Sequence, residues 1–228
     1  MLASLADANT SDRKEAMAAD RDIPGKPHRQ RFFPRLAPLF PEAVAAPNIL
    51  HTGFTNANAM LHVANCVANT VRIESGDSYK FYAEGVTPAV AKLYEAINAE
   101  RVAVAAALGA SVPSLADWFD RVYGVREASL VETCRRLTYN SDGPYQATGT
   151  PSSLDHKFIT EDVPTGLIPM SGLGAAGGVT TPAIDALVAI VRGMTGKDFA
   201  AEGRTLERLG LSGMSASEIG RVMNEGFA

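Results

Sequence analysis

Apolar positions recur at helical spacing along most of the chain, and the range 88–108 shows this pattern most clearly. Thr87-Pro88 supplies an N-cap residue followed by proline at the first helical position, and Gly109 stands just past the other end. Between them, one set of positions repeats at steps of three and four: Val90, Leu93, Tyr94, Ile97, Arg101 and Val104. This pattern predicts a long helix with one buried stripe.

Similar start and stop residues predict further helices. The ranges are 56–75 before Gly76, 114–123 before Gly124, 127–137, 181–192 behind Thr181-Pro182, and 215–224, where Ser215 and Glu218 match a capping box. Residues 138–180 are rich in turn-forming residues and are predicted to be mostly irregular. No apolar strand alternates with the helices at the spacing of a βαβ unit, so the predicted fold class is all-α.

The predicted helix 56–75 carries an unusual row of polar side chains. At 100° per residue, Asn58, His62, Asn65 and Asn69 fall within about 60° of one another, while the other faces are mostly apolar. Uncharged hydrogen-bonding groups around one histidine are typical of the wall of a polar cleft. An ordinary solvated face remains the alternative.

Composition narrows the classes of function. The chain has 228 residues, 46% of them hydrophobic and 20% charged, and its net charge of −4 comes without a basic run. These values indicate a globular protein with no nucleic-acid partner. No apolar stretch has the length of a membrane span, and charged residues occupy the amino-terminal segment, so we expect no membrane and a cytoplasmic location. Cys66 and Cys134 match no metal spacing, and no metal site is expected.

One glycine motif matches the dinucleotide fingerprint in spelling alone. Gly172, Gly174 and Gly177 have the spacing G-x-G-x-x-G, but no strand is predicted before them and the next helix starts only at Pro182. We therefore interpret the motif as a tight connecting loop that does not bind a cofactor.

Three stretches carry a family resemblance. Residues 48–74 (NILHTGFTNANAMLHVANCVANTVRIE), 81–88 (FYAEGVTP) and 159–169 (ITEDVPTGLIP), the last followed by TPAIDAL at 181–187, closely resemble the helical catalytic domain of octopine, nopaline and related opine dehydrogenases. The resemblance spans roughly 35–226. It implies a helical domain like the carboxy-terminal domain of 6-phosphogluconate dehydrogenase-like enzymes, with 1–34 as a poorly defined lead-in and 35–228 as the domain itself.

The resemblance also implies a chemistry and its residues. Members of the family condense an amino acid with an α-keto acid and reduce the imine with NAD or NADP held by an amino-terminal Rossmann domain. The catalytic histidine corresponds to His62 and its carboxylate partner to Asp162. A substrate-binding arginine corresponds to Lys157. Because an ammonium cannot grip a carboxylate bidentately as a guanidinium does, substrate preference should differ here.

The residue types suit this reaction independently. A histidine near neutral pH can move protons during imine formation, and a carboxylate on one ring nitrogen sets its tautomer. Two substrate carboxylates need cations, for which Lys157 and Arg72 are the candidates, and Asn58, Asn65 and Asn69 could add hydrogen bonds. We expect His62 and Asp162 to lie within hydrogen-bond reach.

No Rossmann domain is predicted before residue 35, so we expect a truncated or split chain whose nucleotide is bound mainly elsewhere. A separate Rossmann subunit or a homo-oligomer would cover the exposed cleft wall and the apolar residues Phe32, Phe33 and Phe40. Two alternatives remain open. One is a non-enzymatic helical dimerisation module, and the other is the helical domain of another β-hydroxyacid-type dehydrogenase.

Overall fold

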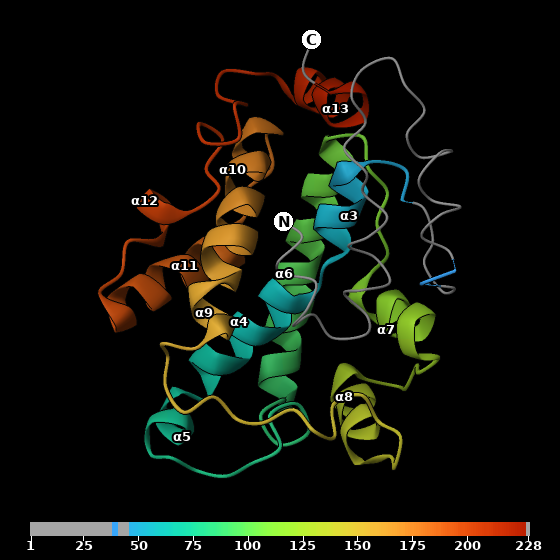
Figure 1. The fold of residues 1–228 in the computed structure, drawn as a ribbon, viewed down its shortest axis with the longest axis vertical. Coiled ribbons are helices and arrows are strands. Elements are labelled where there is room, and N and C mark those ends of the chain that lie inside the picture. Colours follow the sequence, from blue (N-terminus) through green and yellow to red (C-terminus); the bar gives the residue numbers. More distant parts are fainter. Residues whose placement is uncertain (1–37, 41–45, 227–228) are drawn as a thin grey trace.

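The computed structural model describes residues 38–40 and 46–226, and every regular element in these ranges is helical (Figure 1). The predicted all-α class is confirmed. The helices are α3 (Ile49–Thr55), α4 (Asn58–Ala68), α5 (Thr70–Glu74), α6 (Pro88–Ala107), α7 (Leu115–Tyr123), α8 (Leu130–Tyr139), α9 (Lys157–Thr160), the π-helical turn η2 (Val163–Leu167), α10 (Ile168–Ala176), α11 (Pro182–Thr195), α12 (Phe199–Glu202) and α13 (Ala216–Glu225). The predicted lead-in 1–34, with Phe32 and Phe33, lies outside the described residues. Within the described ranges, the helices are too short or too polar to cross a bilayer.

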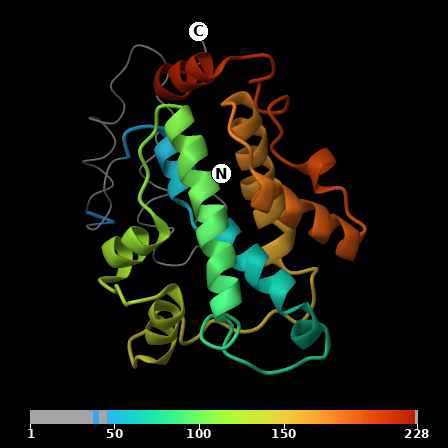
Figure 2. The same cartoon turned by 180° about the vertical axis from the view of Figure 1, so that it is seen from behind.

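The long helix α6 forms the centre of the domain (Figures 1 and 2). It contacts α3, α4, α8, α10 and α11. The hydroxyl of Thr87 accepts the N–H of Val90, as the cap pattern predicted, and Tyr94 on the predicted stripe is completely buried. Arg101 on the same stripe donates to the carbonyl oxygens of Phe54 and Pro113, so a buried cation ties α6 to α3 and to the segment before α7.

The predicted helix 56–75 is interrupted at Asn69. This residue ends α4 and precedes α5, and its Nδ2 donates to the side-chain oxygen of Asn65 at 2.7 Å and to the carbonyl of Gly85 at 3.0 Å. Its Nδ2 also donates at 3.0 Å to the carbonyl of Asn65, which accepts the backbone N–H of Asn69, and apolar periodicity cannot reveal such a side-chain contact. The prediction of one continuous helix was therefore wrong at this position.

The irregular segment predicted for 138–180 is also wrong in its second half, where α9, η2 and α10 lie. Pro164 and Pro169 stand in the first turns of η2 and α10. Pro169 has no N–H to donate, and the carbonyl of Pro164, five residues before it, accepts the N–H of Arg204 at 2.8 Å instead. Gly174 lies inside α10, and a Cβ added to it would lie 2.9 Å from Thr181 Cγ2 and 3.2 Å from Val104 Cγ2. The glycine motif 172–177 is thus a helix that packs closely on its neighbours, and not the predicted loop.

The other helix ends follow the predicted caps with two differences. Ser114 and the capping box of Ser215 and Glu218 start α7 and α13 as predicted, whereas α8 begins three residues later than predicted, behind Ser129. The first turn of α11 donates two backbone N–H groups to the carboxylate of Glu100, at 2.7 and 2.9 Å. A glutamate from α6 therefore caps α11 in place of Thr181.

Candidate active site

His62 on α4 and Asp162, between α9 and η2, meet at the surface of the domain. Nδ1 of His62 lies 2.6 Å from Oδ2 of Asp162, and the two side chains are 12% and 16% exposed. Because a carboxylate only accepts, the neutral tautomer that suits this contact has its proton on Nδ1 and a lone pair on Nε2. The predicted approach of these two residues, 100 positions apart, is confirmed.

Aromatic rings hold the plane of the His62 imidazole. Phe158 on α9 stacks on it with centroids 3.8 Å apart and an interplanar angle of 18°, and Tyr82 lies 6.2 Å away. His156 stands edge-on to Phe158, and its Nδ1 accepts the N–H of Phe158 at 3.3 Å as the cap of α9. Burial lowers the pKa of His156 and the nearby Lys157 ammonium lowers it further, while the Asp162 carboxylate acts in the opposite direction. These contacts leave the imidazole little freedom to rotate.

Phe158 had no signal in the sequence that would mark it as part of the site. Its ring meets His62 because α9 packs on α4, two elements that are distant in the chain. His156 also has no distinguishing pattern in the sequence, because its capping role depends on α9, which lies in a segment predicted to be irregular.

The asparagine row on α4 separates into different roles. Asn65 is completely buried and donates to the carbonyl of Phe81 at 2.8 Å, while Asn69 donates to Gly85. The two amides therefore hold the turn 81–85 against α4, and Asn65 presents no surface to a ligand. Asn58 is half-buried in the first turn of α4, where its backbone N–H donates to Asn56 Oδ1 at 2.9 Å.

The two candidate cations also differ. Arg72 lies 3.7 Å from Asp77 and 3.5 Å from Glu84, and its guanidinium covers the ring of Tyr79 at 3.8 Å. Its charge already has partners. Lys157 is exposed at the start of α9, and no carboxylate of the described ranges lies within ion-pair distance of it.

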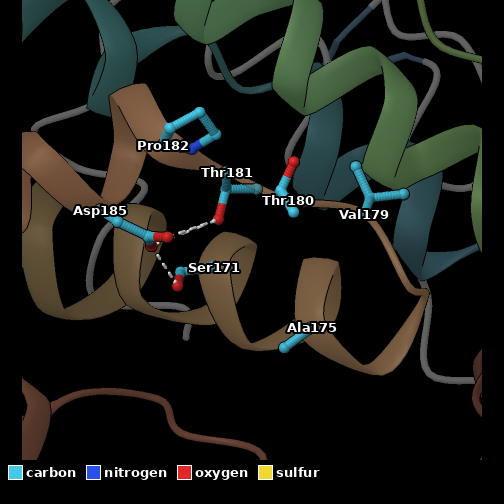
Figure 3. A pocket seen from close by; sticks show the side chains of 7 residues that line it. All are labelled: Ser171, Ala175, Val179, Thr180, Thr181, Pro182 and Asp185. Carbon is cyan, nitrogen blue, oxygen red and sulfur yellow. Dashed lines mark hydrogen bonds between the residues drawn. The ribbon is translucent and has the colours of Figure 1, made fainter.

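A separate hollow of about 300 Å³ lies between α10 and the start of α11 (Figure 3). Its lining residues are Ser171, Ala175, Val179, Thr180, Thr181, Pro182 and Asp185. The hydroxyls of Ser171 and Thr181 donate to the Asp185 carboxylate at 2.6 and 3.2 Å, so these polar groups satisfy one another. Neither His62 nor Asp162 lines this hollow, which sets it apart from the candidate site. Over the part of the chain that is described, histidine, cysteine and carboxylate side chains do not gather into a metal-binding group.

The fold resembles part of the octopine dehydrogenase fold. A structure of octopine dehydrogenase in complex with NADH and agmatine superimposes with a TM-score of 0.63 at 19% identity, covering 81% of this chain and 51% of that one. A second, described as octopine dehydrogenase with NADH and L-arginine, gives 0.66 at 18% identity, covering 88% and 54%. Both matches show that this chain shares the fold of about half of each octopine dehydrogenase chain.

Sequence comparison then shows the family. The model of the NAD/NADP octopine/nopaline dehydrogenase alpha-helical domain matches residues 45–195, so the chain belongs to the octopine/nopaline dehydrogenase family. It is 40% identical over 185 residues to the opine dehydrogenase of Arthrobacter sp. (strain 1C), covering 81% of this chain and 50% of that protein. It is 28% identical over 173 residues to protein ocs of Agrobacterium vitis, covering 75% and 47%. The chain spans about half the length of these relatives.

Proposed function

We propose that this chain is the substrate-binding and catalytic part of an opine-type dehydrogenase, which joins an amino acid to an α-keto acid by reductive condensation or performs the reverse reaction. The observation that carries the proposal is the 2.6 Å contact between His62 and Asp162. A histidine placed in this way beside a carboxylate is suited to proton transfer at neutral pH.

His62 supplies the acid–base chemistry in this proposal. Its Nδ1–H donates to Asp162, so Nε2 can take a proton from the substrate ammonium and return it as the carbinolamine loses water. Asp162 stabilises the imidazolium that forms and keeps the ring in one tautomer. Phe158, stacked on the ring, keeps water from one of its faces.

Lys157 is the proposed partner for a substrate carboxylate. It is exposed and free of carboxylates within the described ranges, and it lies five residues before Asp162 on the same short segment. As an ammonium it acts as a point charge, which tolerates more than one orientation of the carboxylate. Arg72, Asn65 and Asn69 are engaged elsewhere, so the proposal gives them no contact with substrate.

The described residues do not form a dinucleotide site. The glycine motif 172–177 lies in and at the end of α10, and no strand of the described ranges leads into it, so the required strand, turn and helix unit does not occur there. Because octopine dehydrogenase structures are described with NADH, we place a nicotinamide cofactor, NAD or NADP, outside the described residues. The hydride of the proposed reaction comes from that cofactor.

The test joins this chain to the nucleotide-binding half of the Arthrobacter relative and follows oxidation of a panel of opines with NAD⁺ or NADP⁺. We expect turnover, and we expect His62→Gln and Asp162→Asn to lower kcat by about 10²- to 10⁴-fold with smaller changes in KM. Glu127→Gln is the control, because its carboxylate pairs with Arg136 on the surface. Full activity in the His62→Gln enzyme would overturn the proposal.

Substrate binding by the chain alone provides a second measurement. Calorimetric titration with the same opines should give binding that weakens in Lys157→Ala and persists in His62→Gln. A dimerisation module without enzymatic function would bind none of the panel, and a domain from another hydroxyacid-type dehydrogenase would bind hydroxy acids instead. Either result would replace the proposal.

A further inference from the structure

A π-helical turn follows Asp162 directly. The segment 157–176 is helical almost throughout, but η2 (Val163–Leu167) inserts one wide turn, which the N–H of Ile168 closes on the carbonyl of Val163. Each residue of an α-helix advances about 100° around the axis. The extra residue of the π turn therefore rotates the residues before it, Asp162 among them, by about that angle relative to α10. The direction of Asp162 relative to α10 therefore depends on this turn.

A glycine brings this wide turn against the helix that carries His62. Gly166 packs on Ala59, and a Cβ added at Gly166 would overlap the Ala59 Cβ, closer than two non-bonded carbons can come. Ala59 is 3% exposed and lies on α4 three residues before His62, about one helical turn earlier. Gly166 lies four residues after Asp162. The two small residues therefore fix the spacing between the elements that bear the pair.

The opposite side of η2 is held as well. The carbonyl of Pro164 accepts the N–H of Arg204 at 2.8 Å, and a Cβ added at Gly203 would lie 2.9 Å from that same oxygen. The turn is thus confined between α4 on one side and the chain at 203–204 on the other. Extra volume at Gly166 cannot be absorbed by a shift of η2 into open space.

We propose that Gly166 and Ala59 are positioning residues for the histidine–aspartate pair. Their close contact holds η2 at the separation from α4 at which Asp162 reaches Nδ1 of His62. The inference rests on the proposed function for its catalytic meaning, while the geometry can be tested without turnover.

The test observes the Nδ1–H proton of His62 by NMR in histidine-labelled protein. A short hydrogen bond to a carboxylate moves such a proton far downfield, and its loss in His62→Gln assigns the signal. We expect Gly166→Ala to abolish the downfield signal in folded protein, and we expect the double variant Ala59→Gly with Gly166→Ala to restore it. Gly193→Ala in α11 is the control, because a Cβ there meets nothing within 4 Å.

In this chain joined to the nucleotide-binding half of the Arthrobacter relative, Gly166→Ala should lower kcat by about 100-fold with little change in KM, because small misplacements of catalytic groups have effects of that size. A folded Gly166→Ala protein with an unchanged downfield signal would overturn the inference, as would a folded double variant that fails to restore it.

If Gly166→Ala does not fold, the Nδ1–H signal of His62 is measured in the single variant Ala59→Gly instead. The loosened contact should broaden the signal, and a sharp unchanged signal would count against the positioning role. Failure of the proposed function would give a different result. Turnover would then be absent, while the downfield signal would still be lost in Gly166→Ala and restored in the double variant.

Discussion

Replacement of Asn65 by alanine tests whether the asparagine row is structural or binds substrate. Asn65 is completely buried, donates to the Phe81 carbonyl at 2.8 Å and accepts from Asn69 at 2.7 Å. Alanine would leave both partners without this amide. An unsatisfied buried polar group costs about 1–3 kcal/mol, so with two partners affected and a small cavity left behind we expect a loss of about 2–3 kcal/mol.

Thermal and urea unfolding measure this loss directly. For a domain of this size, 1 kcal/mol corresponds to about 2–4 °C, so the melting temperature should fall by about 4–12 °C. Asn140→Ala is the matched control, because Asn140 is exposed at the end of α8 and its removal should change stability by less than about 0.5 kcal/mol.

The isosteric variant Asn65→Asp refines the argument. An ionised carboxylate cannot donate to the Phe81 carbonyl, whereas a protonated one can, so the folded state should favour the protonated form. The variant should therefore be destabilised at pH 7 and recover part of that loss as the pH falls toward 4. Wild-type stability in Asn65→Ala together with loss of opine binding would refute the structural role and return Asn65 to the binding site.

Three further outcomes are expected. Burial raises the pKa of the Cys66 and Cys134 thiols to about 12, so neither should react with a thiol reagent at pH 8 until the protein unfolds. Glu100→Ala should destabilise the domain by about 1–2 kcal/mol in urea unfolding, because two backbone N–H groups in the first turn of α11 lose their acceptor. Glu100→Asp should not restore these two hydrogen bonds. His156 has a lowered pKa and caps α9 in its neutral form. The free energy of unfolding should therefore decrease as the pH falls below about 6.5, the pKa of histidine in the unfolded chain. His156→Asn keeps a capping side chain without a titrating ring and should flatten that part of the pH curve.

Local chemistry determined much of the fold from the sequence. The caps at Thr87, Ser114 and Ser215 and the glycines past the helix ends act within a few residues, so their outcomes can be predicted from the chain alone. The absence of strand patterns indicated the all-α class for the same reason. The pairing of His62 with Asp162 came from the resemblance to the opine dehydrogenase family, because no periodicity relates positions so far apart.

Tertiary contacts decided the remainder. Asn69 ends α4 where its side chain reaches the carbonyl of Gly85, and the glycine motif lies in a helix whose Gly174 packs closely on α6 and Thr181. In each case the contact is with residues that the local sequence pattern does not identify. The stacking of Phe158 and the contact between Gly166 and Ala59 depend equally on such partners. The helices themselves are therefore encoded locally, while the geometry around His62 exists only once α4, α9 and η2 pack together.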